Sequence, residues 1–145
     1  MTAHTYEGGC HCGNIVFTME TVDPPGECNP RACDCDFCLK HAASYVSDPR
    51  GKLAISVKDE SGLSRYRQGD RIADFLVCGN CGVLVAVCYE ENGRLFATVN
   101  SRAVAGRDAF GETKTVSPKK LGRQEKIERW KSVWFGGVVF RCSAP

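Results

Sequence analysis

Short runs of apolar and β-branched residues recur along the chain between polar turn residues, and this pattern predicts a fold built mainly of β-strands. The expected strands lie at 15–19, 44–47, 53–57, 72–77, 83–89 and 95–99. Glu90-Glu91-Asn92-Gly93 separates the last two, and an Asn-Gly pair between two β-rich runs is typical of a hairpin. Turn residues at 23–26 and 48–51 separate earlier strands.

The C-terminal part has a different pattern. Residues 118–131 predict a short helix with Pro118 in its first turn, where proline is tolerated, and residues 133–140 predict a final strand. A still shorter helical segment is expected near Leu39-Lys40-His41. No repeat, low-complexity tract or linker divides the 145 residues, so we expect one domain over 1–145.

Composition describes an ordinary globular chain, with 43% hydrophobic and 25% charged residues. The formal net charge of +2 counts every thiol as neutral. Two zinc ions and seven thiolates would move it to about −1, so the basic isoelectric point does not favour a nucleic-acid partner. No signal-peptide pattern and no apolar run of membrane-spanning length occurs. We therefore expect no membrane association and a cytoplasmic location, where cysteine clusters more often bind metal than form disulfides.

Seven of the ten cysteines fall into three tight clusters. They are Cys10-His11-Cys12, Cys33-Asp34-Cys35-Asp36-Phe37-Cys38 and Cys78-Gly79-Asn80-Cys81. Thiolates one or two residues apart can converge on a soft cation at about 2.3 Å from each sulfur. Seven ligands suit one closed four-sulfur site and one three-sulfur site with an open position. A closed site stabilises a fold, whereas an open one can take part in chemistry.

The middle cluster favours the open site, because its three thiolates lie within six residues. Asp34 and Asp36 are candidates for a fourth ligand, a hydrogen-bond partner of the ligands or a proton acceptor, and equally for solvated turn residues. His41 is a candidate proton acceptor or a packed ring. Cys28 is a candidate redox partner, an alternative ligand or a free thiol.

The order of these motifs resembles the glutathione-dependent formaldehyde-activating enzyme family, which includes the centromere protein V domain. Cys10-His11-Cys12-Gly13 is similar to the opening signature of that family. The middle cluster and Phe75-Leu76-Val77-Cys78-Gly79-Asn80-Cys81-Gly82-Val83 are similar to its later motifs. The resemblance extends from about Gly9 to Val99.

This resemblance implies a mainly β fold of the Mss4-like or β-tent type with two zinc ions per chain. It implies a structural zinc on Cys10, Cys12, Cys78 and Cys81 and a second, catalytic zinc on Cys33, Cys35 and Cys38. The implied activity is that of a carbon–sulfur lyase acting on the adduct of a thiol such as glutathione and an aldehyde such as formaldehyde. The chain departs from the family at Asp34 and Asp36, and two acids beside the metal are expected to disfavour the carboxylates of glutathione.

Two other interpretations stay open. If Asp34, Asp36 or Cys28 closes the second site, both zinc ions are structural and the chain is a non-enzymatic interaction module. If Cys35 and Cys38 pair with Cys78 and Cys81, the chain is similar to a methionine sulfoxide reductase.

Five basic residues are candidate contacts for an anionic substrate: Arg31, Lys40, Arg50, Arg65 and Arg67.

Overall fold

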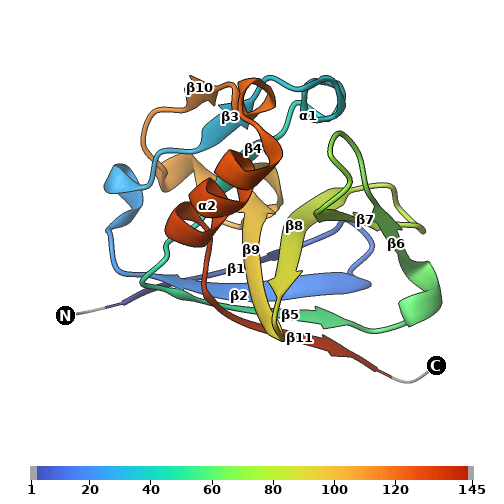
Figure 1. Cartoon of the computed structure of the whole chain (residues 1–145). Coiled ribbons are helices and arrows are strands. Elements are labelled where there is room, and N and C mark those ends of the chain that lie inside the picture. The colour runs from blue at the N-terminus through green and yellow to red at the C-terminus, as the bar shows by residue number, and fades with distance from the viewer. Residues whose placement is uncertain (1–2, 144–145) are drawn as a thin grey trace.

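The computed structural model describes residues 3–143 and is mainly β, with one main helix (Figure 1). Four strands form the first sheet, in the spatial order β1 (His4–Gly9), β2 (Ile15–Thr21), β5 (Lys52–Val57) and β11 (Gly137–Cys142). Seven form the second, in the order β10 (Lys114–Val116), β3 (Arg31–Cys33), β4 (Ser44–Val46), β9 (Arg94–Asn100), β8 (Leu84–Glu91), β7 (Asp74–Cys78) and β6 (Leu63–Tyr66).

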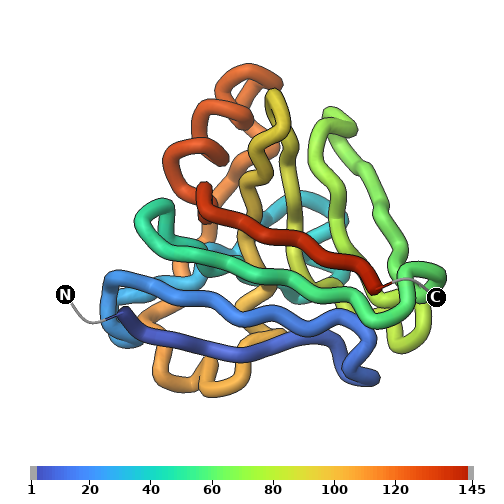
Figure 2. Tube along the Cα trace, turned by 90° about the horizontal axis from the view of Figure 1, so that it is seen from below, coloured from blue at the N-terminus to red at the C-terminus, as the bar shows by residue number. Residues whose placement is uncertain are grey.

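Most neighbouring strands are antiparallel. The exceptions among the described strands are β11 beside β5 and β10 beside β3, which are parallel. Figure 2 shows the four-stranded sheet from below, with its strands side by side in the order given above. The strands of the second sheet cross above it.

The space between the sheets holds the larger core. Along β2 and β5 every second side chain is buried, which is the period that a strand with one solvent-exposed face requires. Ile15, Met19 and Ile55 are among these inward residues, and they pack with Leu76 and Val99 of the second sheet.

The other face of the seven-stranded sheet is covered in part by the helix α2 (Arg123–Val133). Ile127 and Trp134 pack there with Val87 and Phe96 in a second apolar cluster. Because it is covered on both faces, β8 is buried at six successive residues instead of at alternate ones. The remaining helical segments are short: α1 (Asp36–Lys40) and 3-10 turns at Pro25–Glu27, Glu60–Gly62, Ser101–Ala103, Arg107–Ala109 and Pro118–Lys120.

The six expected strands are confirmed, with shifts of one or two residues at most of their ends. Two predictions near the C-terminus are wrong in extent. The segment from Pro118 forms only a 3-10 turn, because Leu121 and Gly122 are extended, and α2 begins at Arg123. The last strand begins at Gly137 because Phe135 instead pairs with Ala97 of β9 through two backbone hydrogen bonds.

The apolar runs of the sequence did not predict β1, β3, β6 or β10. These strands are three to six residues long and carry few apolar side chains, so they give no apolar run to detect. Within residues 3–143, no helix combines the length and the apolar character needed to cross a bilayer.

Candidate metal centres and their pocket

Two turns from different sheets bring four cysteines together. Cys10 and Cys12 lie in the turn between β1 and β2, and Cys78 and Cys81 lie at the turn between β7 and β8. Their four sulfur atoms all lie within 4.8 Å of one another. This grouping is the one that the family resemblance implies, and it joins residues 66 or more positions apart.

The distances between these sulfurs fit a tetrahedral metal site. Cys12 Sγ lies 3.5 Å from Cys78 Sγ and 3.8 Å from Cys10 Sγ. Four sulfurs at about 2.3 Å from one ion would be separated by about 3.8 Å. The backbone N–H of Ile15 donates to Cys10 Sγ at 3.2 Å, and that of Cys81 donates to Cys78 Sγ at 3.4 Å. Such bonds spread thiolate charge around a metal.

The second cluster comes from one continuous segment. Cys33 ends β3, Cys35 precedes α1, and Cys38 lies in α1. The sulfur of Cys35 accepts the backbone N–H of Cys38 at 3.5 Å, in the position of a helix-capping oxygen. The three sulfurs lie within 4.8 Å of one another, and no fourth His, Cys, Asp or Glu of the described residues joins this group.

Two side chains contact these sulfurs from elsewhere in the chain. The Tyr45 hydroxyl on β4 lies 3.0 Å from Cys38 Sγ, and both groups are buried. The Gln68 amide donates to Cys35 Sγ at 3.8 Å. A thiolate has no proton to give, so a metal-bound Cys38 would accept from Tyr45. Burial raises the pKa of Tyr45, which keeps this hydroxyl protonated.

The proximity of the three thiols changes their acidity. Hydrogen bonds from Cys33 and Cys38 hold the pKa of Cys35 well below its usual range. The same contacts raise the pKa of Cys33 and of Cys38, because a second or third thiolate would meet negative charge. The cluster therefore needs a cation to ionise fully, and soft thiolates favour zinc or a similar metal.

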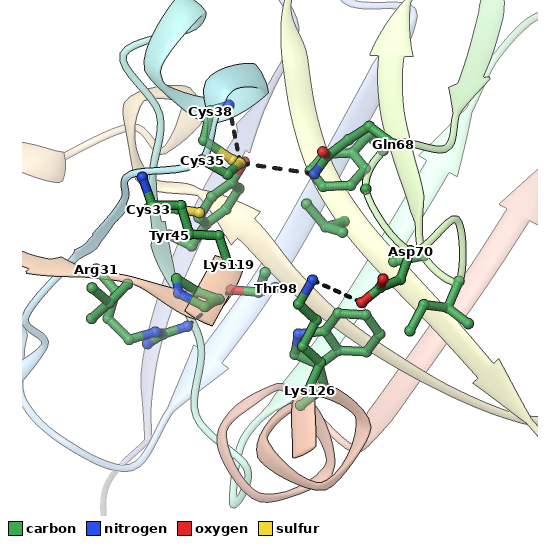
Figure 3. A pocket seen from close by; sticks show the side chains of 18 of the residues that line it. Arg31, Cys33, Cys35, Cys38, Tyr45, Gln68, Asp70, Thr98, Lys119 and Lys126 are labelled. Carbon is green, nitrogen blue, oxygen red and sulfur yellow. Dashed lines mark hydrogen bonds and ion pairs between the residues drawn. The ribbon is translucent and has the colours of Figure 1, made fainter. Parts of the chain in front are cut away.

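A pocket of about 300 Å³ opens beside this cluster. Figure 3 shows Cys33, Cys35 and Cys38 on one side of it and Asp70 with Lys126 on the other. The seven-stranded sheet contributes further residues to the wall, among them Tyr45, Phe75, Val87 and Thr98.

The side of the pocket away from the cysteines consists of α2 and the loop between β6 and β7. Trp130 and Trp134 line it, with their rings stacked at 4.8 Å between centroids. Lys126 forms an ion pair of 2.9 Å with Asp70 of the loop, which ties the two segments together.

Arg31 is the candidate substrate contact that lies in this pocket. Its Nη2 donates to Ser47 Oγ at 2.8 Å and to Thr98 Oγ1 at 3.3 Å. Burial, together with nearby Arg129, lowers its pKa to about 10, so the guanidinium stays charged at neutral pH.

The other candidate cations lie outside the pocket lining. Arg50 is paired with Asp23 and Asp48, Arg65 and Arg67 both contact Asp74, and Lys40 is exposed on α1. Two lysines in the lining, Lys119 and Lys126, were not among the predicted contacts. Their sequence signal was only a mixed-charge helical run, which indicates a solvated surface.

The remaining predicted residues also lie outside the lining. Asp34 bonds to Ser117 through Oδ2, while its buried Oδ1 has no hydrogen-bond partner among the described residues. Asp36 is exposed. The His41 ring lies 4.7 Å from the Phe37 ring at the end of α1, and Cys28 donates to the carbonyl of Asp23 at 3.7 Å.

The positions of the acidic residues and of the cysteines test two of the expectations from the sequence. Neither Asp34 nor Asp36 lines the pocket, so the lining gives no support to the expectation that two acids beside the metal disfavour the carboxylates of glutathione. Asp34 lies between two lining cysteines in an extended segment, where neighbouring side chains point to opposite sides, and Asp36 is exposed at the start of α1. The pairing of Cys35 and Cys38 with a second C-x-x-C turn is wrong. Cys78 and Cys81 group instead with the first cluster.

The fold and these two sites define a β-rich protein with one closed and one open cysteine site, each able to hold a metal ion. The sequence pattern of the glutathione-dependent formaldehyde-activating enzyme family matches residues 5–119. The chain belongs to this family. The matched region includes all seven clustered cysteines and ends before α2.

A solved structure gives a second comparison. The crystal structure of a Rhodobacter sphaeroides protein is similar to this chain with a TM-score of 0.55 and 26% sequence identity. The similarity covers 76% of this chain and 99% of that one. No curated protein compared with the chain is similar enough to count as a match.

Proposed function

We propose that the chain is a zinc-dependent carbon–sulfur lyase that acts on thiol–aldehyde adducts such as S-hydroxymethylglutathione. One observation carries this proposal. Three cysteine sulfurs converge at the wall of a pocket, and no fourth donor among the described residues completes their site. Family membership supports glutathione and formaldehyde as the two reactants.

The reaction breaks one bond between carbon and sulfur. The adduct hydroxyl loses its proton, its oxygen forms the aldehyde double bond, and the electron pair of the C–S bond leaves with the sulfur. The sulfur then takes up a proton to give the free thiol. The reverse sequence forms the adduct. Both directions are easier where the hydroxyl and the thiol are more acidic than in water.

The cysteines supply the metal site for this chemistry. A zinc ion held by Cys33, Cys35 and Cys38 would supply Lewis acidity at an open position and lower the pKa of a hydroxyl or thiol placed there. Tyr45 and Gln68 orient two of the three sulfurs through the contacts described above. The second zinc is assigned to the four-cysteine site, where it stabilises the fold.

The pocket walls keep water away from the reacting groups, and they also supply positive charge. Phe75, Val87 and Trp134 are buried apolar side chains that keep bulk water from one side of the reacting groups. Arg31 adds positive charge for an anionic thiol such as glutathione, whereas Lys119 is paired with Asp34 at 4.0 Å. A role for His41 as proton acceptor stays a prediction, since its ring packs against Phe37 outside the pocket lining. We assign the chain to the cytoplasm, where its free thiols would stay reduced.

Two-dimensional exchange NMR on formaldehyde plus glutathione tests the proposal. We expect the zinc-loaded protein to increase the exchange rate, and chelation or Cys35→Ser to abolish the increase. Cys142→Ser is the matched control, because this exposed cysteine lies outside both clusters and should leave the rate unchanged. No increase in a sample that holds zinc at both sites would contradict the proposed reaction.

A further inference from the structure

The wall of the pocket opposite the cysteines includes three residues outside the family match: Lys126, Trp130 and Trp134. Trp130 and Trp134 belong to α2 and to the residue that follows it, whereas the match ends at residue 119. Ile72 and Val87 extend this apolar wall from the β6–β7 loop and from β8. S-hydroxymethylglutathione is a polar tripeptide adduct, and its formaldehyde-derived part is a single CH2OH group, so it offers no aromatic or branched apolar group to fill such a wall. The family chemistry alone therefore does not account for it.

A second feature of the pocket is the charged side chain of Arg31 in its lining. It lies two residues before Cys33 on β3, so both side chains project from the same face of the strand. Figure 3 shows its guanidinium directed toward Thr98. No ion pair among residues 3–143 includes Arg31, and its two hydrogen bonds end on neutral hydroxyls.

A half-buried cation without a carboxylate partner is costly unless an anion completes it. Both hydrogen bonds of Arg31 start at Nη2, which leaves Nη1 and Nε without a side-chain partner in the described part of the chain. A guanidinium has five N–H donors in a planar fork that matches a carboxylate. Both lysines of the lining are already paired, Lys126 with Asp70 and Lys119 with Asp34, so Arg31 is the lining cation without a carboxylate partner among the described residues.

We propose that this pocket binds a small carboxylate that carries an apolar, preferably aromatic group, with the carboxylate on Arg31 and the apolar group on Trp130 and Trp134. The inference rests on the proposed function in one respect: the carboxylate belongs to the aldehyde or to the thiol of the adduct. The pocket volume of about 300 Å³ is at the lower end for sites that enclose small ligands. A pocket of this volume accommodates one small carboxylic acid.

Tryptophan fluorescence reports directly on the pocket, because both tryptophans of the chain line it. The probes are phenylacetate and its neutral isostere phenylacetamide, titrated into the zinc-loaded protein. We expect saturable binding of phenylacetate and binding of phenylacetamide weaker by about tenfold or more, as for loss of a charged hydrogen bond. Equal binding of the two probes would overturn the proposal without any variant.

Variants locate the carboxylate. Arg31→Gln should weaken phenylacetate by about tenfold or more and leave phenylacetamide unchanged. Arg65→Gln is the control, because Arg65 pairs with Asp74 outside this pocket. An unchanged affinity for phenylacetate in Arg31→Gln would contradict the assignment. If Arg31→Gln does not fold, Trp130→Leu should weaken both probes alike, and unaltered binding there would also contradict it.

Displacement separates the two sources of the carboxylate. Displacement of phenylacetate by glutathione supports the thiol as the source, and displacement by glyoxylate supports the aldehyde. Displacement by neither would show that the pocket does not serve the adduct, and the proposal would fail. None of these binding measurements depends on catalytic turnover. If the protein binds phenylacetate but does not accelerate the exchange between formaldehyde and glutathione, that result contradicts the lyase reaction and leaves this inference standing. Catalysis without carboxylate preference would count against this inference alone.

Discussion

Tyr45 shows how one residue from a neighbouring strand affects a site made by a local segment. The C-x-C-x-x-C spacing already provides three ligands, but it does not control their orientation. Tyr45 follows Cys38 by only seven residues, yet it reaches its sulfur because β4 runs back beside β3. The hydroxyl is buried and has no other hydrogen-bond partner among the described residues, so its contact with the sulfur is specific.

Tyr45→Phe should therefore weaken metal binding at the three-cysteine site by about tenfold, because removing a hydrogen bond to a ligand destabilises the charged form. Competition with a chromogenic chelator measures this affinity. Tyr89→Phe is the matched control, since its hydroxyl donates to Glu91 away from both sites. Equal metal affinity in Tyr45→Phe and the unmodified protein would show that the hydroxyl does not support Cys38.

At the scale of elements, turns decide where strands end and where ligands lie. The β8–β9 hairpin has Asn92 and Gly93 at φ values of 52° and 80°, the left-handed pair that a tight hairpin turn requires. The same conformation recurs at Gly82, beside the ligand Cys81, with φ of 84°. Glycine is favoured there because a side chain in this region is strained.

Gly93→Ala isolates this effect, because nothing lies within 4 Å of the added methyl group and only the backbone conformation matters. We expect a loss of about 1 kcal/mol in the free energy of unfolding, or about 2–4 °C in the melting temperature. Thermal denaturation followed by circular dichroism measures it. Gly26→Ala, also without neighbours but free of a positive φ, should change little. A loss in Gly26→Ala as large as in Gly93→Ala would refute the backbone explanation.

At the scale of the whole molecule, the two cysteine sites differ in which elements they connect. The four-cysteine site joins the β1–β2 turn of one sheet to the β7–β8 turn of the other. A metal there cross-links the two sheets that enclose the main core. The three-cysteine site uses one segment of six residues and links only β3 to α1. Loss of the three-cysteine site therefore leaves the connection between the two sheets intact.

Cys81→Ser should therefore unfold or aggregate the protein, because a structural zinc contributes about 10–16 kcal/mol against a typical total stability of about 5–15 kcal/mol. Cys35→Ser should stay folded with only the four-cysteine site loaded. Metal analysis together with thermal denaturation distinguishes the two outcomes, and Cys142→Ser serves as the control with both sites filled. Equal destabilisation by both substitutions would mean that the division into structural and open sites is wrong.

The features that sequence predicted well depend on residues near one another in the chain. Short β-rich runs of five to eight residues located β2, β5, β8 and β9, and Asn92-Gly93 located the hairpin between the last two. Spacing of one or two residues identified Cys33, Cys35 and Cys38 as one ligand group, since such spacing suffices for convergence. Resemblance to the family also supplied the pairing of the first and third clusters, which spacing alone left open.

Only the tertiary structure decided what surrounds these ligands. Arg31 was one of five similar cations in the sequence, and among them it alone lies in the pocket lining, where it has no carboxylate partner among the described residues. Nothing in the sequence marked Tyr45 or Trp134 as part of the site. In the folded chain β4 places Tyr45 against Cys38, and Trp134, just after α2, lines the opposite wall of the pocket. The physical reason is that strand period and turn conformation are local properties. Burial, charge pairing and pocket shape depend on segments that meet only in the folded chain.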